Sequence, residues 1–173
     1  MKKTTCLVLL FLLLLSSCAP PLTEAEPGKF VDREGKLTRH EFTSAEHGDC
    51  YNLYTYDKLG REKTVVTYRE DGTEVEQREL FYNEAGLHTH TDYTQKVNGE
   101  PRLLVRMEYD ESGLLTRMAT YYENGQTEEE LLYELHPELP ANERLILTIQ
   151  EYDQQGNLIR RERYQNNELI EQG

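Results

Sequence analysis

The residue types in this sequence that could do chemistry gather in one short segment. His88, His90 and Asp92 alternate with other residues. In a β-strand such residues share one face and lie about 7 Å apart. Imidazole and carboxylate groups bind zinc, which needs three or four ligands that converge on one point, and Glu76 and Glu79 are cross-strand candidates. Because residues along one straight strand diverge, the spacing favours an ordinary polar face, and we predict no metal and no cofactor.

Motifs for the common enzyme chemistries are missing from the sequence. It has no phosphate-binding glycine loop, no Cys-x-x-Cys pair and no Gly-x-Ser-x-Gly elbow. Acidic residues are so frequent that pairs of them occur at every spacing by chance. Since no nucleophile, base and orienting group can be nominated together, we predict that the protein is not an enzyme.

Tyrosine is the other conspicuous residue type. The chain has 12 tyrosines and no tryptophan. Five of them recur at equivalent positions of a repeat, namely Tyr56, Tyr82, Tyr109, Tyr152 and Tyr164. In-register rings on adjacent strands predict a packing ladder. The alternative is an aromatic platform for a glycan or a peptide, which requires the rings to face solvent.

The repeat is a turn signature, seen clearly from Tyr109 to Leu114. Asp110 can accept hydrogen bonds from the backbone two residues on, and Gly113 tolerates the left-handed conformation that closes a hairpin. Equivalent glycines follow one another every 12 to 14 residues from Gly35 to Gly125. A period that regular indicates an internal repeat in which each copy reverses the chain.

The segments between turns alternate apolar and polar residues as strands do, for example in residues 103–109. The sequence therefore predicts an all-β antiparallel meander of about nine or ten strands, built from hairpin repeats of roughly 13 residues. Accumulated twist should coil so wide a sheet into an open coiled sheet or a half-barrel. Alternatively the sheet divides at residues 136–142, where Pro137 and Pro140 cannot donate ladder hydrogen bonds.

The amino terminus predicts export. Two lysines, an apolar run from Leu7 to Leu15 and a cysteine after Leu-Ser-Ser resemble the lipobox signal peptide of bacterial lipoproteins. The resemblance implies cleavage before Cys18, lipidation of that cysteine and anchoring in the cell envelope, in the outer membrane if the host is diderm. We expect residues 1–17 to be the signal peptide, 18–28 a lipidated tether and 29–173 the β-hairpin repeat domain. Cys50 is left without an intramolecular partner and is predicted to be buried.

Two repeat families resemble the turn motif. Tyr-Asp-x-x-Gly-x-Leu, at residues 109–115 and 152–158, is similar to the YD repeat of bacterial RHS-type surface proteins. Tyr121 to Gln126 resembles a MORN-like repeat variant. The first resemblance implies a curled β-shell and the second an elongated hairpin sheet. The chain has too few repeats to enclose a cargo, and it lacks an appended toxin or peptidase segment.

Charge limits the partners. The formal net charge is −13, so the surface repels phosphate backbones and we predict no nucleic acid partner. We expect a binding or scaffolding module for protein or glycan partners. An immunity-type inhibitor of a toxin is the alternative, and a metal-dependent enzyme is a more distant one.

The apolar alternation also predicts where a partner binds. Leu103, Val105, Met107 and Tyr109, beside Leu115, Ala119 and Tyr121, should form the core face. Binding should then use the reverse face, a mixed-charge patch made by His88, His90, Asp92, Arg106 and Glu108. A register error of one residue would exchange the two faces.

Overall fold

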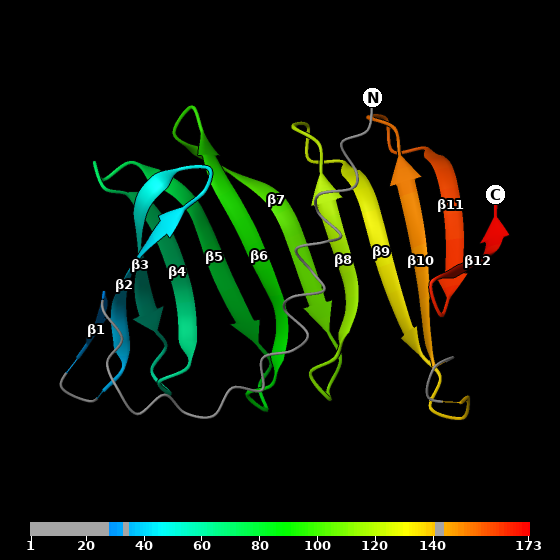
Figure 1. The fold of residues 1–173 in the computed structure, drawn as a ribbon, viewed down its shortest axis with the longest axis horizontal. Coiled ribbons are helices and arrows are strands. Elements are labelled where there is room, and N and C mark those ends of the chain that lie inside the picture. Colours follow the sequence, from blue (N-terminus) through cyan, green and yellow to red (C-terminus); the bar gives the residue numbers. More distant parts are fainter. Residues whose placement is uncertain (1–27, 33–34, 141–143) are drawn as a thin grey trace.

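The computed structural model describes residues 28–32, 35–140 and 144–173, all of which belong to strands, turns and short loops. The predicted signal peptide, Cys18 and nearly all of the predicted tether lie outside the described residues. Figure 1 labels the strands, which are β1 (Lys29–Val31), β2 (Leu37–Ser44), β3 (Gly48–Tyr56), β4 (Glu62–Arg69), β5 (Glu74–Tyr82), β6 (His88–Val97), β7 (Glu100–Tyr109), β8 (Leu115–Tyr121), β9 (Thr127–Leu135), β10 (Leu145–Tyr152), β11 (Leu158–Gln165) and β12 (Glu168–Gln172).

The described strands form one antiparallel sheet in which every strand pairs with its sequence neighbours, in the order β1 to β12. This confirms the predicted all-β meander. The sheet has twelve strands where about nine or ten were expected, and its short edge strands, β1 and β12, are the hardest to recognise from sequence. The sheet does not divide at the loop after β9, because β9 and β10 pair directly and the His136 N–H donates to the Arg144 carbonyl at 2.7 Å.

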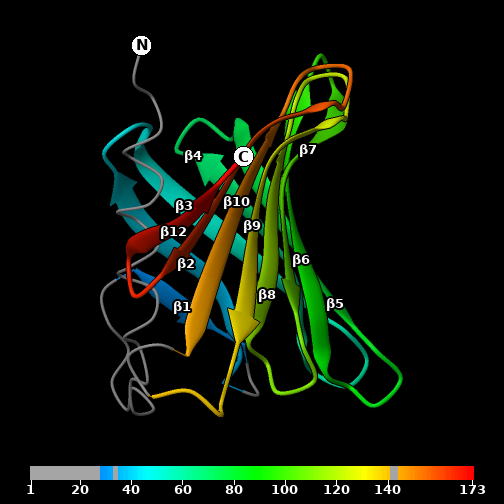
Figure 2. The ribbon, with the colours of Figure 1, turned by 90° about the vertical axis from the view of Figure 1, so that its right-hand side faces the viewer.

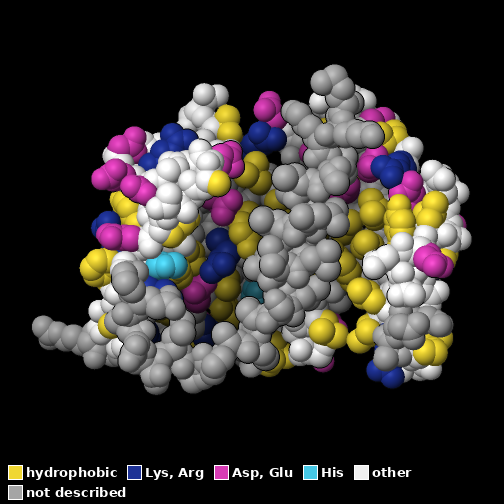
Figure 3. Space-filling model, viewed as in Figure 1, with side chains coloured by type: hydrophobic (Ala, Val, Ile, Leu, Met, Phe, Trp, Pro, Cys, Tyr) yellow, Lys and Arg dark blue, Asp and Glu magenta, His cyan; other side chains and the backbone are white. Residues whose placement is uncertain are grey.

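The sheet is an open trough. Figures 1 and 2 show that its two ends bend toward the same side without meeting. Within the described part of the chain, contacts between strands join sequence neighbours alone. Figure 3 looks onto the concave side, where hydrophobic side chains lie in patches between charged ones. The molecule is therefore a single layer, and no described element covers either face.

The turns have the predicted chemistry. Asp110 Oδ1 accepts hydrogen bonds from the backbone N–H groups of Ser112 and Leu114, both at 2.9 Å. Gly113 has a φ of +82° and its N–H donates to the Asp110 carbonyl. The turn between β11 and β12 has no glycine, and there Asn166 and Asn167 adopt positive φ values instead. Asn tolerates this conformation because its short polar side chain bonds locally.

A β-bulge follows each of these turns. Tyr109 pairs with Leu115 and Glu108 pairs with Arg117, which leaves Thr116 as an extra residue. The same register shift follows the other aromatic-turn hairpins, for example after Tyr82 and after Tyr152. A bulge reverses the alternation of side chains between the two faces. Face assignments must therefore be read from the register and cannot be counted along a strand.

The register defines two faces, named here after adjacent residues of β7. On the Met107 face, Met107 lies opposite Met118, and Met118 lies opposite Leu131. On the Arg106 face, Arg106 lies opposite Ala119. Both faces hold nearly buried residues, since Met118 is 5% exposed and Ala119 is fully buried. The predicted division into one core face and one solvated face is thus replaced by two half-buried faces.

Three residues assigned to the core face belong to the other one. Leu103 pairs with Thr94, whereas Val105 pairs with Tyr93, so a bulge at Leu104 puts Leu103 on the Arg106 face. Ala119, and with it Tyr121 two residues on, lies on the Arg106 face. The prediction assumed unbroken alternation along β7 and β8, because the bulges at Leu104 and Thr116 leave no mark in the apolar pattern. Ala119 is small enough to be covered by the long charged side chains that surround it.

Candidate functional site

The structure brings together four of the five predicted binding residues. Asp92 on β6 lies opposite Arg106 on β7, and His90 lies opposite Glu108. Arg106 donates to both carboxylate oxygens of Asp92, from Nε and from one terminal nitrogen, each at 2.6 Å. These hydrogen bonds raise the pKa of Arg106. A two-point guanidinium–carboxylate pair is among the stronger polar contacts in proteins and holds both side chains in place.

His88 is the residue that does not join them. Tyr82 pairs with His88, whereas the preceding residue, Phe81, pairs with His90, so a bulge at Thr89 separates the two histidines onto opposite faces. The His88 ring lies 4.5 Å from the Tyr109 ring on the Met107 face. The His90 ring stacks on Phe81 at 4.2 Å. The expectation that His88, His90 and Asp92 share a face was therefore wrong at His88.

Arg117 extends the charged surface by two more strands. Its guanidinium bonds Glu108 on β7 at 2.7 Å and also bonds Glu130 on β9. Although partial burial opposes the charged form, the hydrogen bond and ion pair with Glu130 dominate and raise the pKa of Arg117. Tyr152 on β10 donates to the other oxygen of Glu130 at 2.9 Å. Two groups of paired charges, Asp92–Arg106 and Glu108–Arg117–Glu130, thus lie next to each other on β6 to β9, and the Tyr152 hydroxyl joins the second group from β10. They are called the Arg106 network below.

Sequence reasoning missed Arg117 and Glu130. Arg117 lies only nine residues after Glu108, across one hairpin, but its partner Glu130 lies across the next hairpin as well. Finding these contacts needs the bulge positions, which set the cross-strand partners. The bulge that follows most of the turn glycines, although not Gly48, is the signal that could have supplied them.

The tyrosines form two sets. Tyr109 follows Glu108 and faces away from the Arg106 network, whereas Tyr121 and Tyr152 lie on the Arg106 face itself. All 12 tyrosines are half-buried. The hydroxyl groups of Tyr56 and Tyr82 donate to backbone carbonyls of neighbouring strands at 2.8 and 2.7 Å. These contacts are those of a packing role, and the rings form no single ladder because Tyr152 is on the face opposite Tyr109.

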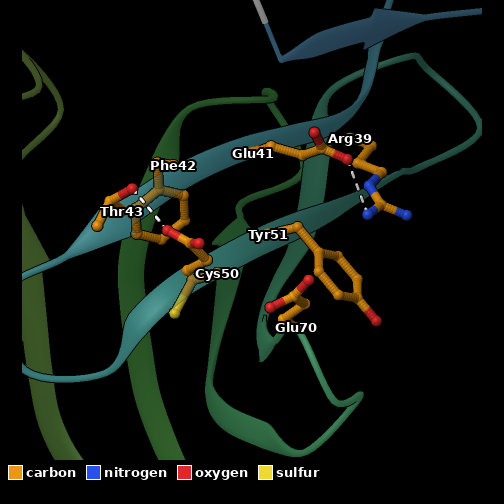
Figure 4. Close-up of a pocket in the computed structure, with 8 residues that line it drawn as sticks. Arg39, Glu41, Phe42, Thr43, Cys50, Tyr51 and Glu70 are labelled. Atoms are coloured by element: carbon orange, nitrogen blue, oxygen red, sulfur yellow. Dashed lines mark hydrogen bonds and ion pairs between the residues drawn. The ribbon is translucent and has the colours of Figure 1, made fainter.

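A hollow of about 400 Å³ lies beside β2 and β3. Figure 4 shows Arg39 and Glu41 paired at its wall, with nitrogen and oxygen 2.8 Å apart. The Arg39 guanidinium also lies over the Tyr51 ring, at 4.1 Å from its centre. Cys50 lines the same hollow and is 4% exposed, which confirms that it is buried. At the same wall Thr43 donates to Asp49 at 2.8 Å, whereas the buried Arg39 Nε has no hydrogen-bond partner among the described residues.

Metal binding has no preformed centre among the described residues. No group of three or more His, Cys, Asp or Glu side chains in that part of the chain is placed to hold a metal ion. At the predicted position, the bulge at Thr89 turns His88 to the face opposite His90 and Asp92, so the three side chains do not converge. Within the same residues, no helix is long and apolar enough to span a membrane.

Comparison with known proteins gives little beyond this. No family model matches the chain, and no curated protein matches it. One solved structure to which the chain is similar is TcdB2-TccC3-TEV, with 13% sequence identity and a TM-score of 0.25 over 82% of this chain. Another is TcdB2-TccC3-Cdc42, with 14% identity and a TM-score of 0.24 over 79%. The chain spans 9% of the length of each of those chains. The β-hairpin repeat architecture rests on the strand order and turns described above.

Proposed function

We propose that this chain is a lipid-anchored β-repeat protein of the cell envelope that acts as a binding or scaffolding module for a protein or glycan. The observation that carries the proposal is the Arg106 network, whose two groups of paired charges lie next to each other across β6 to β9 of a single-layer sheet. Paired, partly desolvated charges of both signs recognise a partner by electrostatic complementarity. A module of this kind needs area and fixed polar groups, and it needs no catalytic centre.

The shape of the network favours a protein over a lipid surface as the partner. Its acidic groups would repel anionic headgroups, while alternating signs match the mixed charge of a protein interface rim. The side chains are also held by their neighbours. Asp92 is 14% exposed and Glu130 is 16% exposed, so little side-chain freedom is lost on binding.

Exchange of one ion pair tests this surface. Asp92→Arg combined with Arg106→Asp keeps the pair but reverses the charges that a partner meets. The full chain would be purified with its cross-linked partners from envelope preparations, and we expect the reversed variant to lose them. The matched control is Glu62→Arg with Arg78→Glu, which exchanges an ion pair whose Arg78 lies opposite Val65, away from the network. Retention of every partner by the first variant, with the fold intact, would refute this location.

The anchor is tested separately. Cys18→Ala should move the protein from the membrane fraction to the soluble fraction and abolish metabolic labelling with a fatty acid. Several acyl chains hold a protein on a bilayer durably, whereas an unlipidated chain of this charge has no comparable attraction. Continued labelling of the variant would show that the lipobox assignment is wrong.

A further inference from the structure

Two glutamates oppose each other on the Met107 face near one end of the sheet. Glu129 on β9 is the direct cross-strand partner of Glu151 on β10. Like charges at directly opposed positions destabilise a sheet. The residue that faces Glu129 from β8 is Thr120, which carries no charge. Glu129 is half-buried, so solvent only partly relieves the repulsion.

The nearby cation is engaged elsewhere. Arg160 on β11 bonds Glu151 at 2.6 Å and Glu162 at 2.5 Å. It therefore serves two carboxylates, while Glu129 makes neither an ion pair nor a side-chain hydrogen bond with any described residue. On β9 itself, Glu128 adds a further negative charge, and Tyr133 is the other titratable group nearby. Burial, followed by the charges of Glu151 and Glu128, raises the pKa of Glu129, and Arg160 offsets this in part.

We propose that Glu129 and Glu151 form a proton-binding pair that tightens the β9–β10 hairpin as the medium becomes mildly acidic. A proton on Glu129 removes the cross-strand repulsion. It also gives Glu129 an O–H group that can donate a hydrogen bond to a neighbouring carboxylate. Glu151 is the member of the pair that bonds Arg160. The device is independent of any partner, since it rests on the sheet alone.

The sign of the effect follows from linkage. The folded protein binds the proton more tightly than the unfolded chain, in which Glu129 has its ordinary pKa of 4.5. Between that value and the higher folded value, stability rises as the pH falls. The stabilisation is complete below the unfolded pKa and is lost as the pH rises through the folded pKa.

The test is carbon NMR of the Glu129 carboxyl in the full chain, combined with denaturant unfolding between pH 4.5 and 7.5. We expect Glu129 to titrate above 4.5 and to move toward 4.5 in Glu151→Gln. Glu129→Gln should raise the unfolding midpoint at pH 7.5 and flatten its dependence on pH. Glu111→Gln, in the exposed turn after β7, is the control and should leave that dependence unchanged. Titration of Glu129 at or below 4.5, or an unchanged pH dependence in Glu129→Gln, would overturn the proposal.

Discussion

Gly113 shows how one backbone dihedral closes each hairpin. Its φ of +82° lies in the left-handed region, and no atom of any residue other than its two chain neighbours lies within 4 Å of the position that a Cβ would occupy. A substitution here therefore tests conformational strain alone. Gly113→Val should lower the free energy of unfolding by more than about 1 kcal/mol, as measured by denaturant unfolding, because a β-branched residue is strained at positive φ.

Gly113→Asn is the control for that measurement. Asn98, Asn166 and Asn167 already adopt positive φ in this chain, so asparagine should cost less than valine at position 113. Equal losses in the two variants would show that the dihedral does not limit stability at this turn.

The residues of the candidate site were predictable in type but not all in position. His90, Asp92, Arg106 and Glu108 meet as expected, since alternation along β6 and β7 holds between their bulges. His88 was misplaced because one extra residue, Thr89, reverses the alternation. A bulge changes the face of a side chain without changing the hydrophobic pattern enough to be seen in the sequence.

Between elements, Arg117 is the side chain that ties three strands together. Its loss leaves Glu130, which is 16% exposed, without its cation. Arg117→Ala should lower the free energy of unfolding by about 1 to 3 kcal/mol, because a half-buried carboxylate loses a charged hydrogen bond. Denaturant unfolding at neutral pH measures the change.

Arg161→Ala is the matched control on β11. Arg161 is 44% exposed and its nitrogen lies 3.8 Å from a Glu171 oxygen. Exposed ion pairs contribute about 0 to 1 kcal/mol to the free energy of unfolding, so Arg161→Ala should lose no more than that. If both variants lost the same stability, the network would hold the strands no better than ordinary surface charges do.

Cation–ring contacts between hairpins also repeat along the sheet. Lys36 follows the turn glycine Gly35, and its ammonium group lies over the ring of Tyr56, which precedes the next turn on the same side of the sheet. Arg61 follows Gly60 and lies over the Tyr82 ring in the same way. The turns and strands themselves could be predicted from the glycine period. These contacts could not, because they join residues about 20 apart whose alignment depends on two registers at once.

At the scale of the whole molecule, the absence of contacts beyond neighbouring strands in the described sheet determines how it loses structure. Stability in such an array is close to a sum of terms between adjacent strands, so the ends should fray first. We expect amide hydrogen exchange to be slowest in β6, β7 and β8 and fastest in β1 and β12. Uniform protection from β2 to β11 would instead indicate one cooperative unit.

The exchange of faces between alternate turns has a consequence for how this chain can change in length. Successive turns lie at opposite ends of the strands. They are related by a rotation of 180° about an axis that runs across the strands in the plane of the sheet. Tyr109 and Tyr121 therefore occupy equivalent places on opposite faces. A sequence that gained or lost a single strand would turn every later side chain to the other face and reverse every later strand. Insertions and deletions of whole repeats are therefore compatible with the sheet only in pairs, and two strands with both their turns are the smallest increment of growth.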